Sequence, residues 1–305
     1  MKFSAAFTSL CLAAVAVALP AEKRADSSTS AAPTVTDILN YALTLEHLEN
    51  AFYAEGIKNF THLSFIEAGL PGFAAGRFSE IAQHEATHVQ FLAGALGESA
   101  TQACNYNFPV TDAKSFAQVS YLLENVGTSA YSGAAQYLSG GTLTAAATIL
   151  AVEARHSAWV NSAVLKANPW NGAFDTPLDL NQVYTLASGL ITSCPSSNPT
   201  LPVKAFPALT FGSDMTAGKA TTVSFNGSDA SSADGTYVGF ISGMNTTIVP
   251  VQNGQVTIPD GLMGVVYAVA TSSESMTSDN VTLAGPAFLS FDFGPNGKPI
   301  GHWLL

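Results

Sequence analysis

The chain has 305 residues, of which 47% are hydrophobic and only 11% are charged, and its formal net charge at pH 7 is -11. This length allows two domains with sizeable buried cores, since one domain usually takes about 100 to 200 residues. An acidic chain is not attracted to phosphate backbones or anionic lipid surfaces, so we expect no nucleic acid and no membrane among its partners.

The first residues have the pattern of a secretory leader. An apolar stretch over 7–19 is too short to span a membrane, and it ends in small residues suited to signal-peptidase cleavage. The pair Lys23-Arg24 looks like a processing site for a kexin-type protease. The sequence therefore predicts a secreted, extracellular protein. The predicted segments are a signal peptide at 1–18, a pro-segment at 19–24 and a flexible lead-in at 25–35.

Residues 36–194 show the periodicity of a helical domain. Four long segments repeat apolar residues at intervals of three and four, and a shorter fifth segment follows them. Thr36, Asp112 and Thr142 are the predicted N-caps, and glycine or proline marks the helix ends. The predicted helices span 37–58, 73–96, 112–138, 142–166 and 179–191.

Cysteines and glycosylation triplets agree with secretion. Cys11 lies in the predicted leader, so the mature chain keeps Cys104 and Cys194, which we expect to form one disulfide in an oxidising compartment. The chain is also expected to be a glycoprotein, because it contains Asn-x-Ser/Thr triplets. They begin at Asn59, Asn226, Asn245 and Asn280.

From residue 204 to 305 the pattern changes to short β-branched runs separated by Gly, Asp and Asn. Such spacing predicts an all-β sandwich, immunoglobulin-like in architecture. The runs cover 221–225, 237–241, 256–258 and 264–270.

The helical region contains one pattern of candidate metal ligands twice. In each copy a lone Glu on one helix is followed by Glu-x-x-His on the next, and the Glu and His of that motif share a helix face. Each candidate also lies on a largely apolar stripe that faces inward. The predicted ligands are Glu46, Glu85, His88, Glu124, Glu153 and His156.

The charge pattern of the third and fourth helices supports burial of these groups. Between Lys114 and Lys166 the only Asp, Glu, Lys or Arg residues are Glu124, Glu153 and Arg155. Arg155 is two positions from Glu153, so it can point to solvent while Glu153 points inward. Buried carboxylates need compensating charge, and two divalent ions would balance four of them. Mixed carboxylate and imidazole ligation suits iron or manganese better than zinc.

Some assignments stay open. Glu49 shares a face with Glu46 and could replace it as the ligand from the first helix. Tyr53, Tyr121 and Tyr131 are core residues or hydrogen-bond donors to the ligands. An overlapping pattern, His84-Glu85-x-x-His88, is the zinc metalloprotease motif, but it places His84 on a stripe with charged neighbours and does not explain the second copy.

These motifs resemble the ferritin-like superfamily, and more narrowly the fungal secreted ferritin-like proteins described as stress-response or sexual-development proteins, related to plant desiccation-related proteins. The resemblance extends over about 36–194. It implies an all-α ferritin-like four-helix bundle with a di-iron-type site formed by the six predicted ligands. The residues that carry it are Leu45 to Glu49 with Phe52-Tyr53, Glu80 to Ala82 with Glu85 and His88, Leu123 to Gly127, and Ile149 to His156.

Two functions of different classes follow. In the first, the bundle holds two iron or manganese ions and carries out protective redox chemistry on dioxygen or peroxide. In the second, the protein is a non-catalytic structural or binding protein of the cell wall or matrix, with cell-wall components as partners. Metal content separates the two hypotheses.

Overall fold

The computed structural model describes residues 32–225, 228–229, 235–298 and 300. The predicted signal peptide and pro-segment, most of the lead-in, and Asn226 lie outside these residues. Among the described helices, none is both long enough and apolar enough to cross a membrane. From Pro33 onward, the described residues form one compact unit.

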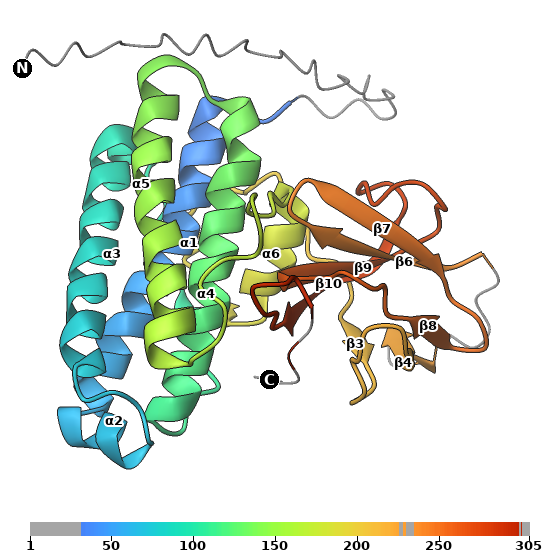
Figure 1. Cartoon of the computed structure of the whole chain (residues 1–305). Helices are drawn as coiled ribbons and strands as arrows, with labels where there is room; N and C mark the ends of the chain where they lie inside the picture. Colours follow the sequence, from blue (N-terminus) through green and yellow to red (C-terminus); the bar gives the residue numbers. More distant parts are fainter. Residues whose placement is uncertain (1–31, 226–227, 230–234, 299, 301–305) are drawn as a thin grey trace, which may run out of the picture. The chain divides into compact units, whose positions relative to one another are not determined.

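Four long helices form an antiparallel bundle in which α1 packs against α3 and α4 packs against α5 (Figure 1). A short helix, α2, precedes α3, and α6 follows the bundle. A π-helical turn at Val160–Val164 extends α5 beyond Trp159. The predicted all-α bundle with a fifth short helix is therefore confirmed. The helices are α1 (Val35–Asn59), α2 (His62–Glu67), α3 (Ala74–Leu96), α4 (Ala113–Ala134), α5 (Gly140–Trp159) and α6 (Leu180–Ser188).

The helix starts follow local capping chemistry. Asp112 caps α4 as predicted, because its carboxylate accepts a hydrogen bond from the amide of Ser115 at 2.7 Å. The predicted caps Thr36 and Thr142 are wrong. Helix α1 begins earlier because Thr34 and the carboxylate of Asp37 satisfy each other's backbone amides. Helix α5 begins at Gly140, whose φ of +55° lets the chain turn into the helix.

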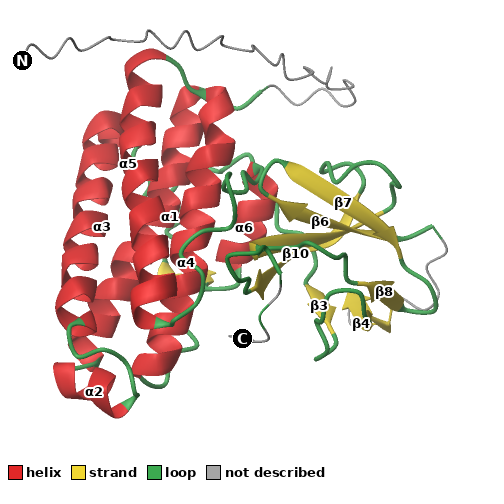
Figure 2. Ribbon diagram, viewed as in Figure 1, coloured by secondary structure: helices red, strands yellow, loops and turns green. Residues whose placement is uncertain are grey.

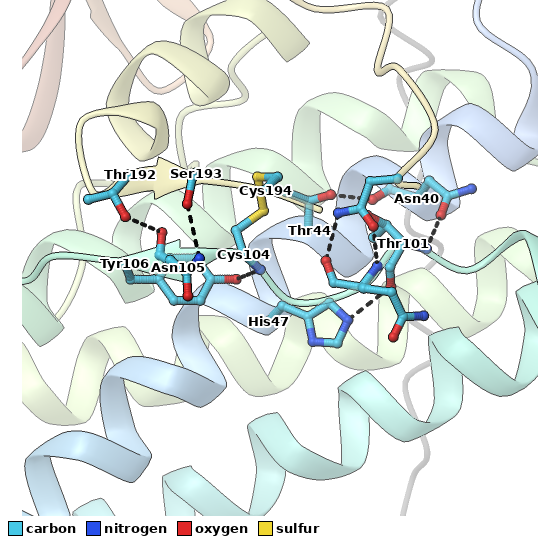
Figure 3. The surroundings of a disulfide bond; sticks show 12 residues. Asn40, Thr44, His47, Thr101, Cys104, Asn105, Tyr106, Thr192, Ser193 and Cys194 are labelled. Atoms are coloured by element: carbon cyan, nitrogen blue, oxygen red, sulfur yellow. Dashed lines mark hydrogen bonds between the residues drawn. A yellow bond between two sulfur atoms is a disulfide. The ribbon is translucent and has the colours of Figure 1, made fainter. Parts of the chain in front are cut away.

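A disulfide joins Cys104 to Cys194, as the sequence predicts (Figure 3). It lies beside a two-stranded antiparallel pair, β1 (Asn105–Tyr106) and β2 (Ile191–Ser193). Nearby, the amide of Thr101 donates to Asn40 Oδ1 at 2.8 Å. The disulfide therefore fixes the segment after α3 to the segment after α6, next to the start of α1.

The C-terminal part consists of antiparallel sheets, which confirms the predicted all-β region (Figure 2). One sheet has the order β10-β9-β6-β7, and the other contains β3, β4 and β5, with β8 also paired to β4. The strands are β3 (Leu209–Phe211), β4 (Ala220–Phe225), β5 (Ser228–Asp229), β6 (Tyr237–Ser242), β7 (Asn245–Pro250), β8 (Gln255–Thr257), β9 (Gly264–Thr271) and β10 (Thr282–Phe291).

Strand β9 packs against both parts of the fold, and all of its residues are buried. Val265, Tyr267 and Val269 belong to the apolar cluster of the helical bundle, whereas the alternate residues fill the core between the sheets. The hydroxyl of Tyr267 contacts Ser129 Oγ at 2.9 Å and donates to the backbone oxygen of Asn125 at 3.1 Å. The sheet therefore packs directly on α4, the helix that carries Glu124.

Candidate metal centre

The structure brings the six predicted ligands together inside the bundle. They come from α1, α3, α4 and α5, one long helix for each element of the repeated pattern. All four glutamates have a relative exposure of 0%, and both histidines are buried. The side chains belong to Glu46, Glu85, His88, Glu124, Glu153 and His156.

Their donor atoms form two adjoining sets, each with all of its atoms within 4.8 Å of one another. One set contains Glu46 and His88, and the other contains Glu124 and His156. Glu85 and Glu153 belong to both sets, so a carboxylate from each Glu-x-x-His motif lies between the two positions. The two sets therefore share two carboxylates, and each adds one Glu and one His, which are residue types that ligate metals in helical bundles.

Each imidazole turns its Nδ1 toward the carboxylates. His88 Nδ1 lies 3.0 Å from Glu85 and 3.2 Å from Glu46, while His156 Nδ1 lies 3.2 Å from both Glu85 and Glu124. Burial alone would lower the pKa of both imidazoles, but these carboxylates raise the pKa of each to about 10. Burial would raise the pKa of Glu85, yet the two imidazoles hold it at about 2.

The remaining carboxylates are poorly compensated by the protein. Burial raises the pKa of Glu46 to about 7 and, reinforced by repulsion from Glu85, raises the pKa of Glu153 well above its usual range. Within the described part of the chain, both oxygens of Glu153 lack a hydrogen-bond partner. One oxygen each of Glu46 and Glu85 also lacks one, and an imidazole nitrogen lies within ion-pair distance of these two oxygens and of Glu153 Oε1. Burial of such oxygens is costly unless they are protonated or gain a partner such as a cation.

Glu49 adds a fifth buried carboxylate, with 4% relative exposure. Burial and repulsion from Glu85 raise the pKa of Glu49 well above its usual range. It belongs to neither donor set among the described residues. Instead, it approaches Gly127, where a Cβ atom would lie 3.1 Å from Glu49 Oε1 and 2.5 Å from Glu153 Oε2. On α1 a second glutamate, Glu49, stands three residues after Glu46. The equivalent position on α4, three residues after Glu124, is Gly127, so the second copy of the pattern has no counterpart of Glu49.

Two tyrosines hold the terminal glutamates from the opposite helix. Tyr131 on α4 donates to Glu46 Oε1 at 2.5 Å, and Tyr53 on α1 donates to Glu124 Oε1. Each tyrosine follows the lone Glu of its own helix by seven residues, which is two helical turns. Tyr121, in contrast, contacts Ser290 Oγ at 2.8 Å and plays no part in the cluster.

His84 is exposed on α3, yet it contacts the site from outside. Its Nδ1 lies 2.9 Å from His156 Nε2, and the two rings are stacked 5.1 Å apart with an interplanar angle of 6°. This contact holds the His156 ring with its other nitrogen toward the carboxylates. In the described chain His84 belongs to neither donor set, so the zinc-protease motif does not account for the geometry.

Comparison with known proteins agrees with this architecture. The model of a family described as "Ferritin-like domain" matches residues 34–166, a range that contains all six predicted ligands. Protein rds1 of Schizosaccharomyces pombe is 27% identical over 174 residues, which cover 56% of this chain. The match spans 42% of the length of that relative, which is less than half.

Proposed function

We propose that the buried cluster of this ferritin-like helical domain binds two iron or manganese ions. The ions would serve protective redox chemistry on dioxygen or peroxide. Glu85 and Glu153, which belong to both donor sets, would contribute to both positions. Glu46 with His88 would complete one position, and Glu124 with His156 would complete the other.

The observation that carries this proposal is the state of Glu153. Its carboxylate is fully buried, and among the described residues neither oxygen has a hydrogen-bond partner, the nearest imidazole nitrogen being His88 Nδ1 at 3.6 Å from Oε1. A buried polar group without a partner costs about 1–3 kcal/mol, and more if it is charged. Because Glu153 belongs to both donor sets, bound cations would give its oxygens the partners that the protein does not supply.

The donor set also fits the proposed ions. Four carboxylates supply four negative charges, which two divalent cations balance, and the histidines add neutral nitrogen donors when they lose their protons. Oxygen-rich ligation with imidazole suits iron or manganese, while structural zinc favours four-coordinate sites rich in sulfur and nitrogen. When bound, such ions would supply electron transfer to dioxygen or peroxide.

The chain itself positions and protects the site. Tyr131 and Tyr53 fix the rotamers of Glu46 and Glu124 by donating hydrogen bonds across the bundle. His84 fixes the His156 ring from the surface. The buried setting excludes bulk water, which strengthens electrostatic interactions between the ligands and any cation.

Secretion remains a proposal, supported by the predicted leader and by the disulfide. Disulfides persist mainly in oxidising compartments, so Cys104 and Cys194 agree with an extracellular or cell-wall location. Mass spectrometry of the protein from culture medium tests this. A chain that begins near Ala25 supports the proposal, and a chain found only inside cells with its N-terminus intact overturns it.

Metal content of the purified full chain tests the metal centre. After anaerobic loading with iron(II) or manganese(II), we expect two ions per wild-type chain. Glu153→Gln, which preserves shape, should lose at least one ion. Glu80→Gln is the matched control, because Glu80 is exposed on α3 and paired with Arg77 at 2.7 Å.

The outcomes distinguish the candidate functions. Two ions in Glu80→Gln but fewer in Glu153→Gln would support the dinuclear centre. Substoichiometric metal in the folded wild-type chain would overturn it and favour the non-catalytic wall or matrix protein. For the redox role, air exposure of the iron-loaded protein should change its optical spectrum, and an unchanged spectrum would count against it.

A further inference from the structure

A cavity of about 230 Å³ at one end of the bundle is lined by residues of α1, α3, α4 and α5. Its lining includes Ala42 of α1, Leu92 of α3, and Ala146 and Ile149 of α5. No charged residue is among the described residues that line it. Phe91 also contributes and is 52% exposed, so the cavity reaches the surface at this ring.

The cavity and the candidate metal centre share one side chain. Tyr131 lines the cavity, while its hydroxyl donates to Glu46 Oε1 at 2.5 Å. On α3 the lining residue Leu92 follows His88 by four residues, and on α5 Ile149 precedes Glu153 by four. The cavity therefore lies about one helical turn from the carboxylate cluster, with the Tyr131 side chain between them.

We infer that this cavity binds an uncharged apolar molecule about the size of one substituted aromatic ring, next to the metal centre. An apolar cavity of about 150 Å³ stays dry and holds benzene, so the larger space here accepts a ring with a small substituent. The uncharged lining gives a carboxylate or ammonium no partner, which would make burial of a charged ligand costly. That the bound molecule is a substrate of the centre rests on the proposed function, whereas the binding itself does not.

Toluene is the probe, and binding is measured by calorimetry and by the shift in melting temperature of the full chain. Ala146→Leu fills the cavity from α5 and should weaken toluene binding at least about tenfold, because the added side chain takes the space of the ligand. Ala147→Leu is the matched control, since Ala147 is the adjacent, exposed residue of α5. Ala42→Leu fills the cavity from α1 and should weaken toluene binding in the same way, so it replaces Ala146→Leu as the test if that variant does not fold.

Isotope-edited NMR places the probe. Nuclear Overhauser contacts from toluene to the Tyr131 ring are expected in the wild-type chain and should disappear in the filled variants. No toluene binding up to its solubility limit would overturn the inference, as would equal binding in wild type and both filled variants. Metal content is measured in parallel, so toluene binding without metal would refute only the proposed function, and metal without toluene binding would refute only this inference.

Discussion

Gly127→Ala tests the geometry of the metal centre with one added methyl group. The new Cβ would lie 2.5 Å from Glu153 Oε2, whereas ordinary contact begins at 3.4 Å, so this carboxylate must move by about 0.9 Å. The obstructing atom is the end of a flexible side chain, so the helix should still fold. Alanine also favours the helical state by about 1 kcal/mol over glycine, which partly offsets the crowding.

The cost should appear in metal affinity. Misplacing a ligand or its support typically weakens metal binding by about 10–100-fold, which is about 1.4–2.7 kcal/mol. Because Glu153 belongs to both donor sets, we expect both ions to bind less tightly. The assay is competition with a chelator of known affinity, together with thermal unfolding of the metal-free protein.

Gly94→Ala is the control for the glycine substitution. No atom lies within 4 Å of the position its Cβ would take, so it should stabilise α3 by about 0.5–1 kcal/mol and leave metal affinity unchanged. Unchanged metal affinity in Gly127→Ala, with a folded protein, would refute the assignment of Glu153 as a shared ligand.

Further predictions concern the ligands and the disulfide. Tyr131→Phe removes the donor to Glu46 and should lower metal affinity by about tenfold in chelator competition, while Tyr184→Phe on α6 should have no effect. The pKa values of His88 and His156 are raised from 6.5 to about 10, so the stability they contribute to the metal-free protein is present below pH 6.5 and lost as pH rises toward 10. The raised pKa of Glu153 acts in the same direction. The melting temperature of the metal-free chain should therefore fall between pH 6.5 and 10, and a rise would contradict these ion pairs. Replacing Cys104 and Cys194 with serine should cost about 2–4 kcal/mol in urea unfolding, and an unchanged midpoint would show that the bond adds no stability.

The sequence predicts the six candidate ligands because each lies on a periodic, largely apolar helix face. Contacts between helices are harder to predict, since they depend on how the helices pack. The pairing of Tyr53 with Glu124 and of Tyr131 with Glu46 is an example. A signal was nevertheless present, because both tyrosines follow a lone Glu by two helical turns. The contact of His84 with His156 joins residues 72 positions apart and has no local signature.

The β-rich part shows the same limit. A continuous apolar run such as Gly264–Thr271 predicts a central strand, but the sequence does not reveal what covers each face of that strand. The structure shows helix on one side and sheet on the other. The π-helical turn at Val160–Val164 was also missed, because its residues suit an α-helix equally well and only the hydrogen-bond pattern distinguishes the two.

The packing of β9 and β10 on α4 also limits how copies of this protein can assemble. Tyr267 and Phe288 from the sheet form an edge-on aromatic contact, and Phe288 makes another with Tyr121 of α4. That side of the bundle is therefore already occupied within one chain. A cage in which neighbouring subunits meet through this side of α4 would first require the sheet to detach.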